Sequence, residues 1–326
     1  MERKVKEIHI TSLEKYVKEI NKKCFNKKTL FPESIDNIWF RGESKSYPHI
    51  APSLFRGNFN EKNKGISIND ESKLIEKVFQ FTPDLFSGCR NAIERLVTMQ
   101  HYLLPTRLLD VTKNPLVALF FACNENEDDD GRVLFVKKQP QSTDFALNII
   151  ATIIESFDHN DVVTIDDIYK ILIERGLFNK SNDIKIVLKE KVNVCEIVTK
   201  PHFYLPKYNN QRIKNQRGAV LCAQLFEFFG DLEIQKKSKR LLKSYINNKS
   251  NPRKINFKFH KQYSEFSNLF GNNFFIIDKD YKTKILRELD NYGINEAVVY
   301  PEYEHQMQYI KRYCTPIQNW DIDLTF

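Results

Sequence analysis

The sequence lacks any hydrophobic run long enough to form a membrane-spanning helix. None of its apolar stretches approaches the ~20 residues that are needed to cross a bilayer. Its first residues, MERKVKEIHI, carry charges where a secretory signal peptide has an apolar stretch. We therefore expect a cytoplasmic protein without a membrane partner.

Side chains at metal-binding spacing are also missing. The six cysteines include no C-x-x-C pair, and the seven histidines do not fall at zinc-ligand distances from them or from one another. We expect reduced structural thiols and no metal cofactor. A metal-dependent nuclease using Asp110 is conceivable, but we interpret the acidic run ENEDDD at 125–130 as a solvated loop.

A third absence concerns the glycine-rich loops that hold phosphates. Neither G-x-G-x-x-G nor G-x-x-x-x-G-K-[ST] occurs, and strands and helices do not alternate regularly, which argues against a Rossmann domain and a P-loop NTPase. A chain of 326 residues with 41% hydrophobic side chains can fill a large core. We predict an α+β fold, in which a mixed or antiparallel central sheet is surrounded by helices.

Local patterns place the elements of this fold. Aromatic and β-branched runs predict strands at 37–42, 106–112, 132–138, 193–200, 218–228, 274–278 and 295–300. Periodic apolar residues and capping signals predict helices after a capping box at Thr11 and Glu14, at 72–100 with a break near Pro83, at 114–123 with Asn114 as cap, in an insertion at about 142–188, at 281–293, and from about Glu302.

Positive charge is concentrated in one segment. The chain has a formal net charge of +8, and ten basic residues but no acidic one lie between 234 and 264. Aromatic residues are interleaved there, which suits stacking on bases beside phosphate contacts. The alternative is a solvated, lysine-rich insertion.

The run QHYLLPTRLLDVT at 100–112 alternates polar residues with leucines. Buried polar side chains need partners, so Arg107 and Asp110 either pair in a structural salt bridge or serve a site. His101 is a conceivable general base near neutral pH. Tyr102 either stacks on a ligand ring or belongs to the core. Arg41 ends the strand NIWFRG, and its planar fork suits phosphate oxygens.

Four motifs follow one another in the order found in a known family: WFRGES, QHYLLPTRLLDVTKNPLVALFFA, RIKNQRGAVL and ILRELDNYGINEAVVYPEYE. In these the chain resembles the FRG domain, a bacterial and phage-associated module named for its Phe/Tyr-Arg-Gly motif. The resemblance covers residues 37–312, with the helical insertion and the basic insertion at about 234–264 inside it. An N-terminal helical segment (1–36) precedes it and a C-terminal tail (313–326) follows.

A second resemblance is to arginine-first ADP-ribosyltransferases. The strand end Phe40-Arg41-Gly42 resembles their first motif, and LLDVTKNPLVALFFA resembles their second, with Asp110 and Thr112 where serines are expected. This resemblance implies NAD as substrate, with Arg41 on the pyrophosphate. It also implies further nucleotide-binding candidates: Gly42, Tyr102, Arg107, Thr112 and Arg212.

Gln216, in RIKNQRG, falls near the third transferase motif, where a glutamate is usual. Together with Arg41, Asp110 and His101 it completes the set of catalytic candidates. An amide carries no negative charge, so another carboxylate would have to stabilise the positive charge of the transition state. Candidates for this carboxylate are Glu43, Glu196 and Glu227.

Two functions therefore remain open. The first is a nucleotide-binding, ADP-ribosyltransferase-like effector, either a toxin or an anti-phage defence protein. The second is a non-catalytic module that binds DNA or RNA through the basic segment. Its candidate residues are Lys236, Lys237, Lys239, Arg240 and Lys254. The sequence makes no prediction of the oligomeric state.

Overall fold

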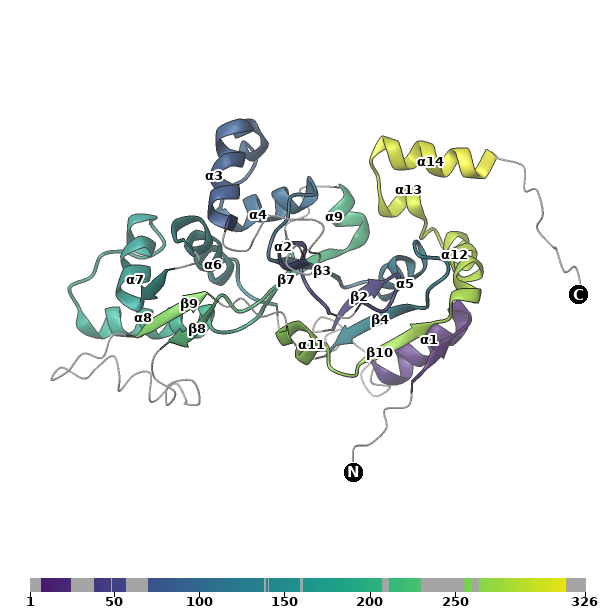
Figure 1. The fold of residues 1–326 in the computed structure, drawn as a ribbon, viewed down its shortest axis with the longest axis horizontal. Coiled ribbons are helices and arrows are strands. Elements are labelled where there is room, and N and C mark those ends of the chain that lie inside the picture. Colours follow the sequence, from purple (N-terminus) through teal and green to yellow (C-terminus); the bar gives the residue numbers. More distant parts are fainter. Residues whose placement is uncertain are drawn as a thin grey trace, which may run out of the picture.

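The computed structural model describes residues 7–24, 38–47, 49–56, 70–137, 139, 141–158, 161–206, 211–229, 255–259 and 264–314. These residues form a mixed fold of helices and strands around a seven-stranded sheet, which confirms the predicted α+β class. In Figure 1 this sheet and its covering helices lie toward the right, and a second, mostly helical part lies to the left.

The large sheet is antiparallel except at one edge. Its order is β1-β10-β4-β2-β3-β7-β6, and only β1 and β10 run parallel. The strands are β1 (His9–Ile10), β2 (Trp39–Glu43), β3 (Leu108–Thr112), β4 (Gly131–Val136), β6 (His202–Tyr204), β7 (Gly218–Cys222) and β10 (Phe274–Ile277). The strands predicted at 37–42, 106–112, 132–138 and 274–278 are thereby confirmed.

Helices cover both faces of this sheet. On one face, α1 (Leu13–Lys23), α5 (Pro115–Cys123) and α12 (Lys282–Asn291) share a core with Phe40 and other strand residues. On the opposite face, α11 (Ser264–Phe270) packs against a core that contains Trp39. Adjacent residues of β2 belong to different cores because successive side chains of a strand point to opposite faces.

The helical part packs around a core that it shares with strands β3, β6 and β7 of the large sheet, through Leu108, Tyr204 and Val220. It contains α3 (Glu71–Phe81), η4 (Pro83–Phe86), α4 (Ala92–His101), α6 (Asp144–Ser156), α7 (Ile165–Glu174) and α8 (Ile184–Val198). A three-stranded sheet joins them, in the order β5 (Val162–Thr164), β9 (Asn256–Phe259), β8 (Phe226–Phe229). The break predicted near Pro83 is confirmed, because η4 separates α3 from α4.

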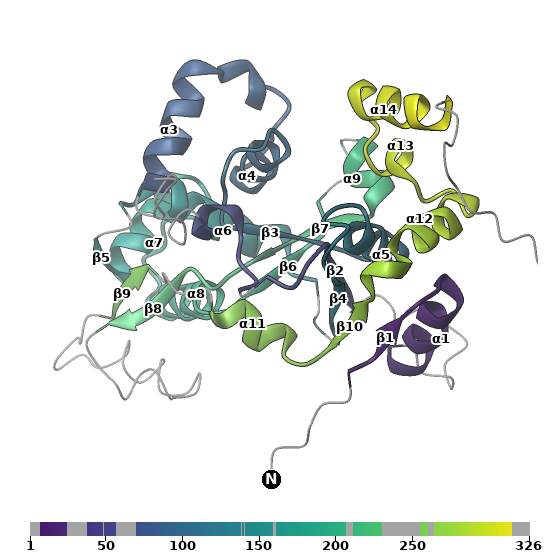
Figure 2. The ribbon, with the colours of Figure 1, turned by 45° about the vertical axis from the view of Figure 1, so that its right-hand side comes forward.

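The remaining helices are short, apart from the last. They are α2 (Ser53–Arg56), α9 (Gln211–Gln216), η6 (Lys279–Tyr281), α13 (Glu296–Val299) and α14 (Tyr303–Cys314). Figure 2 shows α9, α13 and α14 grouped at one end of the molecule, above the large sheet. Because α9 and α14 are far apart in the sequence, this end is assembled only by the tertiary fold.

Helix α5 is central and buried, as its sequence predicts. Asn114 caps it by accepting a hydrogen bond from the backbone nitrogen of Leu116 at 3.0 Å. The helix lies so close to β2 that a Cβ atom on Gly42 would stand 1.9 Å from the carbonyl oxygen of Ala118. Gly42, a predicted nucleotide-binding residue, therefore lets the backbone of α5 approach β2, and it also lines the cavity described below.

Four local predictions were wrong. Residues 218–228, predicted as one strand, form β7 and β8, which belong to different sheets. Ser12, not Thr11, caps α1, and it accepts from the backbone nitrogen of Lys15. Residues 193–200, predicted as a strand, lie mostly in α8, and residues 295–300, also predicted as a strand, contain α13. In both segments valines are buried in helices, namely Val194, Val198 and Val299, because tertiary packing overrides the weak strand preference of Val.

Candidate ligand-binding site

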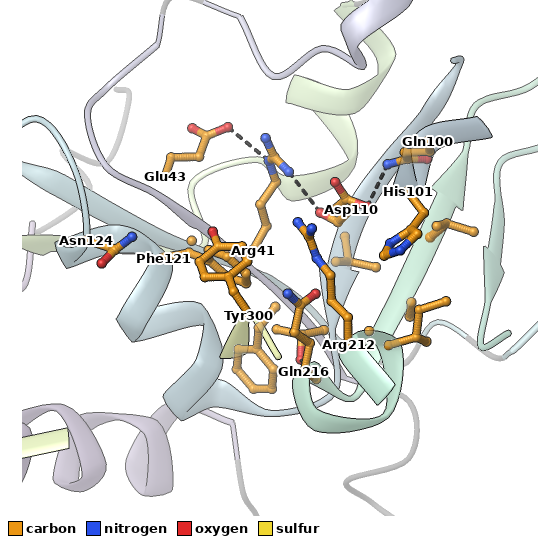
Figure 3. A pocket seen from close by; sticks show the side chains of 18 of the residues that line it. Arg41, Glu43, Gln100, His101, Asp110, Phe121, Asn124, Arg212, Gln216 and Tyr300 are labelled. Carbon is orange, nitrogen blue, oxygen red and sulfur yellow. Dashed lines mark hydrogen bonds and ion pairs between the residues drawn. The ribbon is translucent and has the colours of Figure 1, made fainter. Parts of the chain in front are cut away.

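A cavity of about 290 Å³ opens over the middle of the large sheet. Strands β2, β3 and β7 contribute its floor. The end of α4, the segment after α5, helix α9 and Tyr300 contribute its walls (Figure 3). Polar and charged side chains from distant parts of the sequence therefore face one space.

Arg41 reaches this cavity from β2. Its Nε donates to Glu43 Oε1 at 3.0 Å, and its Nη1 donates to the main-chain oxygen of Asp110 at 2.8 Å. The buried Glu43 also accepts from Arg132 Nε at 2.7 Å. Arg41 is thus braced at two atoms, while its other N–H groups have no partner among the described residues and 12% of the side chain is exposed.

Asp110 stands beside Arg41 on β3, and its side chain is exposed to the cavity. Its Oδ1 accepts a hydrogen bond from Gln100 Nε2 at 2.6 Å. Figure 3 shows Asp110 between Arg41 on one side and Gln100 and His101 on the other. A carboxylate and a guanidinium therefore face the same space.

His101 and Arg212 form a second polar group at the cavity. Burial, reinforced by the nearby Arg212 guanidinium, lowers the pKa of His101, and Glu302 opposes this shift. The imidazole is therefore neutral near pH 7 and able to accept a proton. Arg212 Nη1 pairs with Glu302 at 3.3 Å, and both side chains are partly exposed.

Tyr300 follows α13 and lies under Arg212, whose guanidinium carbon is 4.8 Å from the centre of the ring. The ring also stacks on His305 at 4.6 Å. Burial raises the pKa of Tyr300 to about 12, so its hydroxyl keeps its proton at neutral pH. The segment after α13 thus supplies an aromatic wall to a cavity built on β2, β3 and β7.

Thr112 and Gln216 line the cavity but use polar atoms to join its walls. Thr112 Oγ1 donates to the main-chain oxygen of Gln216 at 2.7 Å, and Gln216 Nε2 donates to the main-chain oxygen of Val299 at 3.0 Å. These bonds connect β3, α9 and α13.

Two sequence-predicted residues lie away from the cavity. Arg107 is fully buried and forms a bidentate pair with Glu71 of α3, through Nε at 2.7 Å and through Nη2. It pairs with Glu71, where we had considered Asp110 as its partner. Tyr102 is 60% exposed just after α4 and does not line the cavity.

Of the three carboxylates proposed to replace the missing glutamate, only one lines the cavity. Glu196 lies on α8 and Glu227 on β8, both in the helical part and not in the cavity lining. Glu43 lines the cavity but is held by two arginines. Asp110 and Glu125 are the other carboxylates among the described residues that line it.

The basic residues proposed to bind nucleic acid lie outside the described residues, and the second function stays a prediction. These residues are Lys236, Lys237, Lys239, Arg240 and Lys254.

Sequence reasoning missed part of the lining, namely Gln100, Phe121, Asn124, Glu125 and Tyr300. Gln100 and Tyr300 fall within the motifs quoted above, so membership in those motifs was the available signal. No local sequence pattern indicates that Tyr300 lies near β3.

The fold and the cavity define an α+β protein with a polar pocket on the strands of its central sheet. Among protein families, the FRG domain model matches residues 36–131 of the chain. This range contains Arg41, His101 and Asp110, and it confirms the resemblance over the first two motifs. The FRG domain has no clear function of its own. No curated protein and no solved structure matched the chain.

Among the residues that the structure describes, no group of three or more His, Cys, Asp or Glu side chains is placed to hold a metal ion. No helix among those residues is long and apolar enough to cross a membrane.

Proposed function

We propose that the cavity binds a nucleotide, with NAD as the expected ligand, and that the protein is an ADP-ribosyltransferase-like enzyme. One observation carries this proposal: Arg41, Arg212 and the Asp110 carboxylate line a single cavity. NAD combines an anionic diphosphate with a cationic nicotinamide ring, and this arrangement offers a partner to each. Such an activity would suit a toxin or a defence effector against phage.

The two arginines would bind the diphosphate. Arg41 is oriented by Glu43 and by the Asp110 main chain, and its remaining N–H groups can donate to phosphate oxygens. The partly exposed pair between Arg212 and Glu302 contributes little in water, so Arg212 can exchange this partner for a ligand.

Asp110 would act on the ribose. When the bond between ribose C1′ and the nicotinamide nitrogen breaks, its electron pair leaves with neutral nicotinamide, and positive charge develops on the sugar. A nearby carboxylate stabilises that charge. The acceptor then bonds to C1′ and loses a proton, which neutral His101 can take up.

The cavity size fits part of this ligand. A volume of about 290 Å³ is at the lower end of the range for small-molecule pockets. The cavity would therefore enclose the nicotinamide ribose and the phosphates, and leave the adenosine at its mouth.

Calorimetric titration with NAD tests the binding step. We expect Arg41→Ala and Arg212→Ala each to weaken NAD binding by at least about tenfold, the loss of one charge-assisted contact. Arg175→Ala is the matched control, because this exposed arginine lies after α7, away from the cavity. The thermal midpoint of Arg41→Ala should stay close to that of the wild type, since Arg132 still neutralises Glu43. Unfolding of this variant would instead assign Arg41 a structural role.

Release of nicotinamide, followed by chromatography, tests the chemical step. Asp110→Asn should bind NAD with nearly unchanged affinity and release nicotinamide at least about a hundredfold more slowly, because the amide offers no negative charge to the transition state. A wild-type protein that neither binds NAD nor releases nicotinamide would contradict the proposed function.

A further inference from the structure

The Asp110 side chain is held by a hydrogen-bonded chain that the proposed chemistry does not by itself require. Gln100 Nε2 donates to Asp110 Oδ1 at 2.6 Å. The other end of the same amide, Oε1, accepts from the hydroxyl of Thr106 at 3.2 Å. This second bond determines which end of the amide faces Asp110, so the carboxylate meets a donor.

Thr106 is itself fixed in place. It is 1% exposed, and its backbone nitrogen donates to Ser53 Oγ at 3.2 Å. Its hydroxyl oxygen also accepts from the backbone nitrogen of Leu108 at 3.3 Å. A buried hydroxyl with these contacts gives Gln100 a rigid support, and the support comes from the turn that leads into β3.

The turn between α4 and β3 has an unusual backbone that brings Gln100 and Asp110 together. Leu103 has φ +63°, a left-handed conformation that non-glycine residues adopt at a cost. Its backbone nitrogen donates to the carbonyl oxygen of Gln100 at 3.0 Å, and the backbone nitrogen of Leu104 donates to the carbonyl oxygen of Met99 at 3.0 Å. These two bonds end α4. The chain then reverses so that the last turn of α4 faces β3.

Asp110 is consequently fixed at two points. Its main-chain oxygen accepts from Arg41, and its Oδ1 accepts from Gln100. Its second carboxylate oxygen has no hydrogen-bond partner among the described residues, and it belongs to a side chain that lines the cavity. The geometry directs one carboxylate oxygen to Gln100 and leaves the other for a ligand.

We propose that Gln100 is the positioning residue that orients the Asp110 carboxylate toward the ligand. The kinetic test of this inference rests on the proposed function, whereas the orientation of Asp110 by Gln100 does not depend on NAD. Gln100 acts through Asp110, so its loss should lower kcat and leave the KM for NAD nearly unchanged.

The substitution Gln100→Glu separates this role from a purely structural one. In Gln100→Glu, the new carboxyl group and that of Asp110 are close enough to share one proton. At about pH 5.5 the protonated glutamic acid can therefore replace the amide as hydrogen-bond donor. At about pH 8 both carboxyl groups are ionised and repel each other. We expect kcat for nicotinamide release within about twofold of wild type at the lower pH and at least about tenfold below it at the higher pH.

The other titratable and charged groups at the cavity are common to both proteins: Arg41, Glu43, Tyr47, His101, Arg212, Glu125, Tyr300 and Glu302. Comparison with wild type at each pH therefore isolates the new carboxyl group. Gln80→Glu, the same substitution on the exposed face of α3, should keep the wild-type pH profile. A Gln100→Glu profile identical to wild type would overturn the proposal, and so would equal inactivity at both pH values in a folded variant.

A second variant covers the case in which the glutamate does not fold. Gln100→Met keeps the length of the side chain without a donor, and kcat should fall at least about tenfold with KM within about threefold of wild type. If wild type itself releases no nicotinamide, the proposed function fails, and a crystal structure of Gln100→Met decides the positioning role. An Asp110 side chain that keeps its orientation there refutes it; one that rotates supports it.

Discussion

The pair between Arg107 and Glu71 gives the sharpest test of the structure against the sequence-based interpretation. The sequence suggested Arg107 as a nucleotide-binding residue. The structure buries it completely and joins it to Glu71, so that the start of β3 is connected to α3. Replacing Arg107 with methionine preserves most of the side-chain volume and removes only the charge and its hydrogen bonds.

The size of the effect follows from burial. The Arg107 side chain is 0% exposed and that of Glu71 is 2% exposed. Removing one partner of a buried ion pair costs about 3–5 kcal/mol, because the remaining charge stays in a medium that solvates it poorly. For a chain of 326 residues, that corresponds to a fall in the thermal midpoint of roughly 4–7 °C. Replacing both partners with apolar residues is often nearly neutral.

Thermal unfolding followed by circular dichroism measures this difference. Arg107→Met should be destabilised by the amount given, and Arg107→Met combined with Glu71→Leu should recover most of it. Arg95→Met provides a comparison, because Arg95 pairs with Glu155 in similar geometry but its side chain is 22% exposed. Arg95→Met should lower the free energy of unfolding by less than half as much as Arg107→Met. An Arg107→Met protein with an unchanged midpoint but lost NAD binding would show that the reasoning is wrong.

Three other predictions address the helix packing, the histidines and the basic segment. Gly42→Ala should destabilise the fold by about 3 kcal/mol or more in urea unfolding, because the new Cβ would overlap the carbonyl of Ala118. Gly88→Ala is the control and should be neutral, because the space around Gly88 is open. Equal urea midpoints for the two variants would refute the packing argument. Burial lowers the pKa of both His101 and His202, so the unfolded state binds more protons than the folded state and the free energy of unfolding should fall as pH drops below about 6.5. His202→Gln should weaken this pH dependence. An unchanged slope of stability against pH in this variant would contradict the role given to His202. If the basic segment binds RNA or DNA, affinity should fall steeply with added salt and should be lost when four of its residues are neutralised; salt-insensitive binding would exclude this role. The four are Lys236, Lys237, Lys239 and Arg240.

Several elements could be predicted because their causes are local. Helix α5 has an asparagine cap, a proline at its first position and an apolar sequence nearly all round, and each of these acts within a few residues. Strands β2 and β3 were equally clear from their aromatic and β-branched residues. Arg41 and Asp110 could be named as site candidates because both lie on these strands, although the sequence could not show that they touch.

Other assignments failed because packing, not local preference, determined them. Helix α8 contains the β-branched residues of a strand, yet Val194 and Val198 are fully buried one helical turn apart. Arg107 and Asp110 are separated by three positions in one short segment. Neighbouring residues on a strand face opposite sides, and the surrounding helices decide which side is closed and which is open.

The sequence by itself therefore determined the class of the fold, the positions of the central strands and of α5, and most of the polar residues at the cavity. The tertiary structure alone decided that Arg107 is neutralised in a core while Arg41 keeps N–H groups available beside a cavity. It also decided that Arg212, Tyr300 and Gln100 meet over β3. The physical reason is that capping and periodicity act along the chain, whereas burial and pairing of a charge depend on groups brought near it by chain segments many residues away.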